Sequence, residues 1–158
     1  MATARKPVLP AIDPASLPER KGVTLYPEPF RAMVAGRARR VLGDALGLTH
    51  FGVNLTRLDP GAYSAMRHWH ALEDEFIYVL EGELTLITDT GEQTLTPGMA
   101  AGFPAGKPDA HHLVNRGDRI ATYLEVGDRR PGETACYPDD DLAMRWTRAF
   151  TRKDGTPY

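Results

Sequence analysis

The feature that most constrains this fold is a series of short segments between residues 49 and 128 that alternate apolar and polar side chains. These segments are 50–58, 68–70, 76–80, 82–89, 92–96, 99–103, 111–115 and 119–128. Turn signals such as Asp59-Pro60-Gly61, Asp89–Glu92 and Pro97-Gly98 separate them. Successive strands without helices between them predict an antiparallel sandwich or barrel. We therefore expect an all-β fold.

Composition excludes several classes of protein. The 158 residues suit one domain with a single core, and the net charge of −2 gives no reason to expect a nucleic acid or an anionic membrane as partner. The basic residues Arg37, Arg39 and Arg40 are better explained as a solvated face or as ion-pair donors than as a nucleic-acid site. With Cys136 as its one cysteine and no apolar signal segment near the N-terminus, the chain is predicted to be cytoplasmic.

The two ends of the chain differ from its middle. Prolines recur near the N-terminus at positions 7, 10, 14 and 18, which predicts an extended arm. Residues 28–47 have helix-forming composition interrupted by three glycines, so their structure stays open. Near the C-terminus we expect one or two added strands and a helical turn at 140–146. The predicted organisation is 1–48 as N-terminal arm and short connecting elements, 49–127 as barrel core, and 128–158 as an irregular extension packing on the barrel.

The stretch HWHALEDEFIYVLEG, residues 68–82, carries the candidate chemistry. Strand side chains alternate between faces, so His68 and His70 point the same way, about 6.6 Å apart along the strand. A carboxylate from the acidic residues that follow would let these groups bind a divalent metal. Histidine pairs on strands are also common as ordinary solvated side chains. The surrounding residues must therefore distinguish a metal site from a solvated pair.

Those surroundings resemble the two sequence motifs of the cupin superfamily, which are small β-barrels of the jelly-roll type. The first motif is matched by Gly61, His68, His70, Glu75 and Gly82, and the second by Gly98, Pro104, Gly106, His111 and Asn115. The spacing before His68 is one residue longer than usual in the family, and the spacing before His111 is two residues longer. The resemblance covers roughly residues 51–126 and implies a cupin-type jelly-roll barrel of antiparallel strands.

The resemblance also implies a metal site. Its ligands would be His68, His70, Glu75 and His111. On an extended strand His111 and His112 face opposite ways, and the longer spacing leaves His112 as an alternative ligand if the register shifts by one residue. Asp74 is the corresponding alternative to Glu75.

Three imidazoles and one carboxylate predict a single divalent transition metal, which could be Fe, Mn, Zn, Ni, Co or Cu, with one or two coordination positions open. Apolar side chains are expected to surround it, namely Ile77, Val79 and Leu113. Candidate polar and aromatic wall residues are Asn54, Tyr63, Phe103 and Tyr123.

Two functions from different classes follow. The first is a metal-dependent enzyme acting on a small organic molecule, with a dioxygenase-like oxidoreductase placed first and isomerase or lyase chemistry next; Glu75 would then be a possible base. The alternative is a non-enzymatic small-molecule-binding or sensing cupin in which the metal is structural or holds the ligand. The resemblance further implies a homodimer.

Overall fold

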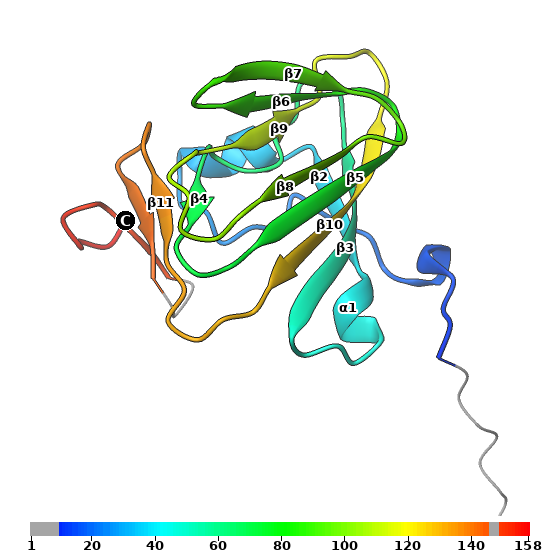
Figure 1. The fold of residues 1–158 in the computed structure, drawn as a ribbon, viewed down its shortest axis with the longest axis horizontal. Coiled ribbons are helices and arrows are strands. Elements are labelled where there is room, and N and C mark those ends of the chain that lie inside the picture. Colours follow the sequence, from blue (N-terminus) through cyan, green and yellow to red (C-terminus); the bar gives the residue numbers. More distant parts are fainter. Residues whose placement is uncertain (1–9, 146–148) are drawn as a thin grey trace, which may run out of the picture.

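The structure is a computed structural model that describes residues 10–145 and 149–158, and its strands form three antiparallel sheets in this part of the chain (Figure 1). The first sheet has the order β1 (Arg20–Lys21), β2 (Arg37–Val41), β3 (Phe51–Leu58), β10 (Ala121–Asp128), β5 (Glu75–Glu81) and β8 (Ala100–Phe103). The second has the order β7 (Gly91–Leu95), β6 (Leu84–Thr88) and β9 (His112–Val114). The third has the order β13 (Phe150–Thr151), β12 (Leu142–Met144), β11 (Ala135–Tyr137) and β4 (Trp69–His70).

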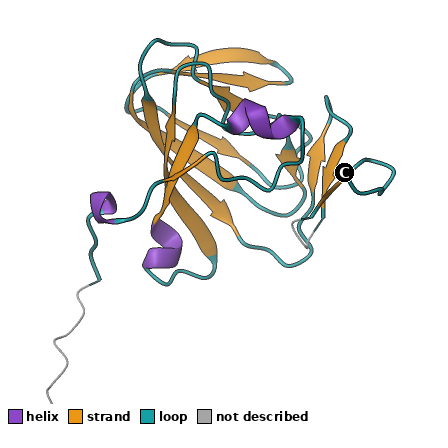
Figure 2. Cartoon of the chain, turned by 180° about the vertical axis from the view of Figure 1, so that it is seen from behind, coloured by secondary structure: helices purple, strands orange, loops and turns teal. Residues whose placement is uncertain are grey.

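Helical segments are short and peripheral (Figure 2). They are the 3₁₀ turns Pro14–Ser16 and Phe30–Val34 and the helix α1 at Leu42–Ala45. None of the helices in the described part of the chain has the length and apolar character needed to cross a lipid bilayer. The predicted all-β, antiparallel jelly-roll architecture is confirmed.

The second and third sheets are joined through single β-bridges, which pair His68 with His111 and Tyr63 with Val114. The apolar core lies between the six-stranded sheet and the three-stranded sheet. Fully buried members of this core are Leu58, Val79, Leu84, Leu95 and Tyr123. A second apolar cluster packs on the third sheet and includes Ala135, Tyr137 and Leu142. The bridge at His68 matters for function, because it places the ends of two different sequence motifs side by side.

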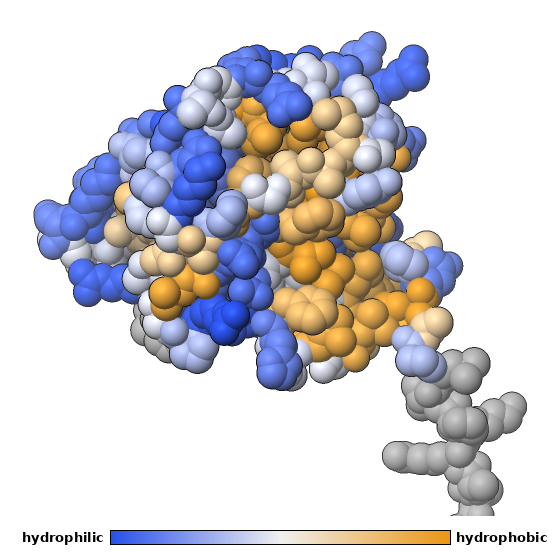
Figure 3. Space-filling model, viewed as in Figure 1, coloured by the Kyte–Doolittle hydropathy of each residue, from blue (hydrophilic) through white to orange (hydrophobic). Residues whose placement is uncertain are grey.

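Strand β5 shows how alternation fixes the two faces of the large sheet. Ile77 and Val79 are buried, and burying side chains of this size stabilises a fold by about 1.5–3 kcal/mol each. Phe76, Tyr78 and Leu80 point the other way and are 44%, 38% and 43% exposed. In Figure 3, which shares the view of Figure 1, apolar side chains gather on the face where β5, β10 and β3 lie. The outer face of this sheet is therefore apolar as well.

The arginine-rich segment that the composition left open is strand β2, paired with β3. Arg39 Nε lies 2.8 Å from a carboxylate oxygen of Glu125, and Arg40 Nη1 lies 3.2 Å from one of Glu19, so the ion-pair prediction is confirmed for these two arginines. Arg37 is only 5% exposed and donates to backbone carbonyl oxygens. For Arg37 the prediction of a solvated face or an ion pair is wrong, because the strand turns its side chain inward.

The two ends of the chain extend the sheets. The N-terminal segment contributes β1, which pairs with β2; Pro7 lies outside the described residues. Near the C-terminus, β11 pairs with β4 and with β12. The prediction of a helical turn at 140–146 is wrong for residues 142–144, which form β12. Leu142 is 1% exposed and pairs with Tyr137 of β11, so this segment is held as a strand. Trp146 lies outside the described residues.

Candidate metal centre

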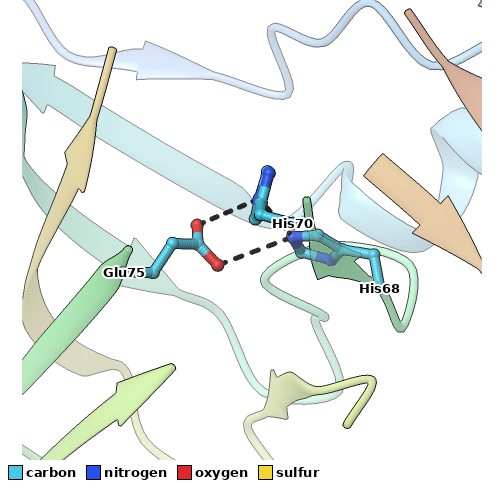
Figure 4. Close-up of side chains that lie close together, drawn as sticks. All are labelled: His68, His70 and Glu75. Carbon is cyan, nitrogen blue, oxygen red and sulfur yellow. Dashed lines mark hydrogen bonds and ion pairs between the residues drawn. The ribbon is translucent and has the colours of Figure 1, made fainter. Parts of the chain in front are cut away.

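Four polar side chains converge inside the barrel, and they are the four that the sequence predicts as metal ligands. His68 and His70 come from the β4 segment, Glu75 from the start of β5, and His111 from the residue before β9. His68 Nε2 lies 3.1 Å from His70 Nε2, and His111 Nε2 lies 2.9 Å from Glu75 Oε2. The Glu75 carboxylate also lies 3.7 Å from His68 Nε2 and 3.5 Å from His70 Nε2 (Figure 4).

The other ring nitrogen of each histidine faces a fixed acceptor. Nδ1 lies 2.8 Å from the Met66 carbonyl oxygen in His68, 3.2 Å from Glu133 Oε1 in His70, and 3.3 Å from the Asp109 carbonyl oxygen in His111. These acceptors assign the proton of each neutral ring to Nδ1 and leave the Nε2 lone pair free. Three lone pairs and a carboxylate then point at one another, an arrangement that needs a cation between them.

This donor set fits a divalent transition metal. Three imidazole nitrogens and one carboxylate are ligands that Mn, Fe, Co, Ni, Cu and Zn all accept. Burial lowers the pKa of His68 to about 4, so this ring stays neutral near pH 7, as a metal ligand must be. His68, His70 and Glu75 also hold their ligand atoms within 4.8 Å of one another. The residues present therefore suit the ion that the sequence motifs imply.

The two alternative ligands lie away from this cluster. His112 turns to the opposite side of its strand, where its Nδ1 lies 3.0 Å from the Ala65 carbonyl oxygen and its ring packs against Tyr63. Asp74 is exposed and accepts a hydrogen bond from the Ala105 backbone N–H at 2.7 Å. The geometry thus favours His111 over His112 and Glu75 over Asp74.

Two cavities of about 250 and 330 Å³ border the cluster. Five of the predicted pocket residues line the smaller cavity, namely Asn54, Ile77, Phe103, Leu113 and Tyr123. Val79 is buried in the core instead, and Tyr63 packs against His112, so the prediction that these two line the pocket is wrong. A substrate-sized space with both apolar and polar walls lies directly beside the proposed ligands.

Comparisons with known proteins agree with this architecture. The Cupin domain family matches residues 54–127. A solved structure described as a sugar phosphate isomerase of the cupin superfamily, from Silicibacter pomeroyi, is 48% identical, with a TM-score of 0.87 over 94% of this chain and 96% of that chain. The chain belongs to the cupin superfamily. The resemblance seen in the two sequence motifs is confirmed.

Other solved structures are similar to this cupin. A protein from Acidithiobacillus ferrooxidans, described as a putative sugar phosphate isomerase, is 31% identical with a TM-score of 0.69, over 75% of this chain and 77% of that one. A polyketide cyclase from Streptomyces resistomycificus, 23% identical over 77% of this chain and 80% of that one, shares the fold with a TM-score of 0.61. No curated protein matches this cupin significantly.

Three further residues of this cupin's site were not predicted from the sequence. Arg39 and Glu125 line both cavities, and Glu133 contacts His70. Glu125 had a signal, because it follows the predicted wall residue Tyr123 by two positions on an alternating strand. Glu133 lies in a loop, where no periodicity indicates its direction.

Glu133 is a positioning residue for this cupin's cluster. It is 3% exposed, and its two oxygens accept the backbone N–H groups of Ala71 and Leu72 at 3.0 and 2.8 Å as well as facing His70 Nδ1. A buried carboxylate on the outer nitrogen of a ligating histidine fixes the ring and raises its basicity. We expect Glu133→Gln to weaken metal affinity by roughly 10–100-fold in a chelator competition titration. The exposed Glu83→Gln is the control, and equal affinity in both variants would refute the role.

Proposed function

We propose that this cupin is a metal-dependent isomerase that acts on a phosphorylated sugar. The observation that carries the proposal is the cluster of three imidazoles and one carboxylate beside a cavity that also holds a separate carboxylate, Glu125. The Silicibacter pomeroyi protein, similar over nearly the whole chain, and the Acidithiobacillus ferrooxidans protein support the choice of isomerisation and of sugar phosphates.

A divalent metal held by the four ligands would act as a Lewis acid on a carbonyl or hydroxyl oxygen. Aldose–ketose isomerisation moves one proton between adjacent carbons and one between their oxygens, with no net oxidation. We propose the enediol route, in which the protein provides a group that accepts a proton from carbon and returns it to the neighbouring carbon.

Glu125 suits this proton transfer. Its Oε1 lies 2.8 Å from Arg39 Nε and accepts a hydrogen bond from Asn54 Nδ2 at 2.9 Å, which fixes the carboxylate in the cavity. The histidines of the metal cluster pair with Glu75 instead. Glu75, the base predicted from the sequence, has imidazole nitrogens within 3.5 Å of both its oxygens. We therefore assign the proton transfer to Glu125, and a basic role for Glu75 stays a prediction.

The two other predicted functions stay predictions. Open coordination positions would serve a dioxygenase as well as an isomerase, and a binding or sensing cupin would need no proton-transfer group at all. We place isomerisation first because the Silicibacter pomeroyi protein is described as a sugar phosphate isomerase and the Acidithiobacillus ferrooxidans protein as a putative one.

The test is an assay of the metal-loaded protein with a panel of aldose and ketose phosphates in deuterated water. Protein stripped with a chelator and reloaded with Mn, Fe(II), Co, Ni or Zn should interconvert at least one aldose–ketose pair, with NMR showing deuterium on the carbon next to the carbonyl. No interconversion with any metal would contradict the proposal. Oxygen uptake with another substrate class would favour the dioxygenase, and binding without turnover would favour the sensor.

We also propose that the protein forms a homodimer. A cytoplasmic location stays a prediction. A second copy would cover the apolar outer face of β5, formed by Phe76, Tyr78 and Leu80, since an uncharged strand face is complementary to itself across a two-fold axis. Light scattering after size exclusion should give twice the chain mass of 17.4 kDa. Leu80→Glu should then give the monomer mass. A wild-type monomer would refute the proposal.

A further inference from the structure

Arg37 is a buried cation with no ion-pair partner among the described residues. It is 5% exposed, and its two Nη atoms donate to the carbonyl oxygens of Ser64 and Val23. The other two arginines of β2 outside its first pair each contact a glutamate. Burial and the charge of Arg39 lower the pKa of Arg37, and they outweigh the opposing effect of Glu125. Carbonyl oxygens accept hydrogen bonds but carry no net charge, so the positive charge of Arg37 is not neutralised by a bound partner.

This cation lines the cavity of about 330 Å³ beside the metal centre. A guanidinium has five N–H donors, and the two carbonyl groups use two of those of Arg37. Arginine is almost never fully buried in proteins unless it is paired. A buried and unneutralised arginine on the wall of a ligand-sized cavity therefore indicates an anionic ligand.

Two tyrosine hydroxyls lie near the same guanidinium. Tyr26 and Tyr137 line this cavity, and their Oη atoms lie 3.4 Å apart. Burial raises the pKa of both, and the positive charge of Arg37 is among the effects that partly oppose this shift. Both hydroxyls therefore keep their protons at neutral pH. One proton serves the contact between the two rings, which leaves the other for an acceptor on a ligand.

The charges on the walls of the two cavities select the larger one for an anion. The cavity of about 330 Å³ is lined by two arginines and two carboxylates, namely Arg37, Arg39, Glu75 and Glu125. The cavity of about 250 Å³ is lined by two arginines and four carboxylates, namely Arg39, Arg129, Glu73, Glu75, Glu125 and Asp128. With neutral histidines, a divalent metal would bring the larger cavity to a net charge of +2 and the smaller one to zero. A phosphate dianion therefore suits the larger cavity.

We propose that Arg37, with Tyr26 and Tyr137, forms a binding site for the phosphate group of a phosphorylated ligand in the larger cavity. Both cavities share Glu75 and Glu125 as lining residues, so a carbon chain attached to this phosphate would extend toward the metal centre and Glu125. The choice of a sugar phosphate rests on the proposed function. The placement of the anion rests on the unneutralised charge of Arg37.

The experiment is isothermal titration of the metal-loaded protein with two probes. Glucitol 6-phosphate is an unreactive open-chain polyol phosphate, and glucitol has the same carbon chain without the phosphate. Wild type should bind the phosphate ester more tightly. Arg37→Gln should weaken its binding by roughly 10–100-fold and leave glucitol unchanged, because lost hydrogen bonds between charged groups have effects of this size. Arg37→Lys keeps the charge and should retain more of the affinity than Arg37→Gln.

Arg40→Gln is the matched control, because it removes the same charge from the opposite face of the same strand and Arg40 lines neither cavity. It should leave both affinities unchanged. Arg37 also contacts two backbone carbonyl groups, so circular dichroism would show whether its variants fold. A crystal structure of wild type with glucitol 6-phosphate tests the site without any variant, and it should show the phosphate against Arg37.

Equal affinity of wild type and folded Arg37→Gln for glucitol 6-phosphate would overturn the inference. The same holds for an equal loss in Arg40→Gln, for a wild type that does not prefer the phosphate ester, and for a crystal structure with the phosphate on the metal or beside Arg129. Turnover of sugar phosphates with unchanged probe affinity in Arg37→Gln would remove the inference and leave the proposed function standing. Weaker binding by Arg37→Gln without any turnover by wild type would support the phosphate site and remove the isomerase proposal.

Discussion

His111→Ala is expected to lower metal affinity by more than roughly 100-fold, whereas His112→Ala leaves it unchanged. The two residues are neighbours in sequence and both are buried, yet only His111 directs its Nε2 toward Glu75, at 2.9 Å. His112 faces the Ala65 carbonyl oxygen on the other side of the strand. Elemental analysis after dialysis and a chelator competition titration measure the difference.

This pair of variants tests the strand register as well as the ligand set. Circular dichroism would show that both variants remain folded, which matters because the His111 ring stacks on Phe103 with a centroid distance of 3.5 Å. Loss of metal in His112→Ala, or retention of wild-type affinity in His111→Ala, would mean that β9 presents its opposite face to the barrel interior.

The second large effect is expected for Glu125→Gln, which should reduce isomerase turnover by about 10²–10⁴-fold, the range typical of a general acid or base. The amide retains an oxygen to accept the Asn54 hydrogen bond but cannot take a proton from carbon. Metal content should stay at the wild-type level, because Glu125 is outside the ligand cluster. Steady-state kinetics with the best sugar phosphate of the panel measures the change.

Glu81→Gln provides the control for this variant, since Glu81 is an exposed carboxylate on β5. It should keep wild-type turnover. If Glu125→Gln also kept wild-type turnover, proton transfer would have to be assigned to another residue, with Glu75 the remaining carboxylate of the four-residue cluster.

The sequence predicts those parts of the site that follow from local periodicity. Side chains two apart on a strand share a face, so His68 and His70 were expected together, and the same rule separates His111 from His112. Alternation in β5 likewise indicates that Ile77 faces inward. The two cupin motifs supplied what periodicity lacks, which is the meeting of segments far apart in the chain.

Other parts depend on long-range pairing and have no local signal. Strand β2 is built around arginines, so no apolar alternation marks it, and the inward direction of Arg37 and Arg39 follows only from its pairing with β3. Glu133 reaches His70 because β11 pairs with β4, which brings the Ala71 N–H to 3.0 Å from the Thr134 carbonyl oxygen. The conformation of β12 likewise depends on its pairing with β11, which its own residues do not indicate.

The measurement that tests the central claim most directly is anomalous X-ray diffraction at the absorption edge of the metal found in the purified protein. The expected result is one ion per chain, at about 2.0–2.3 Å from the Nε2 atoms of His68, His70 and His111 and from a carboxylate oxygen of Glu75, as is usual for such ligands. An ion bound elsewhere, or purified and metal-treated protein that holds no ion among these four residues, would contradict the account.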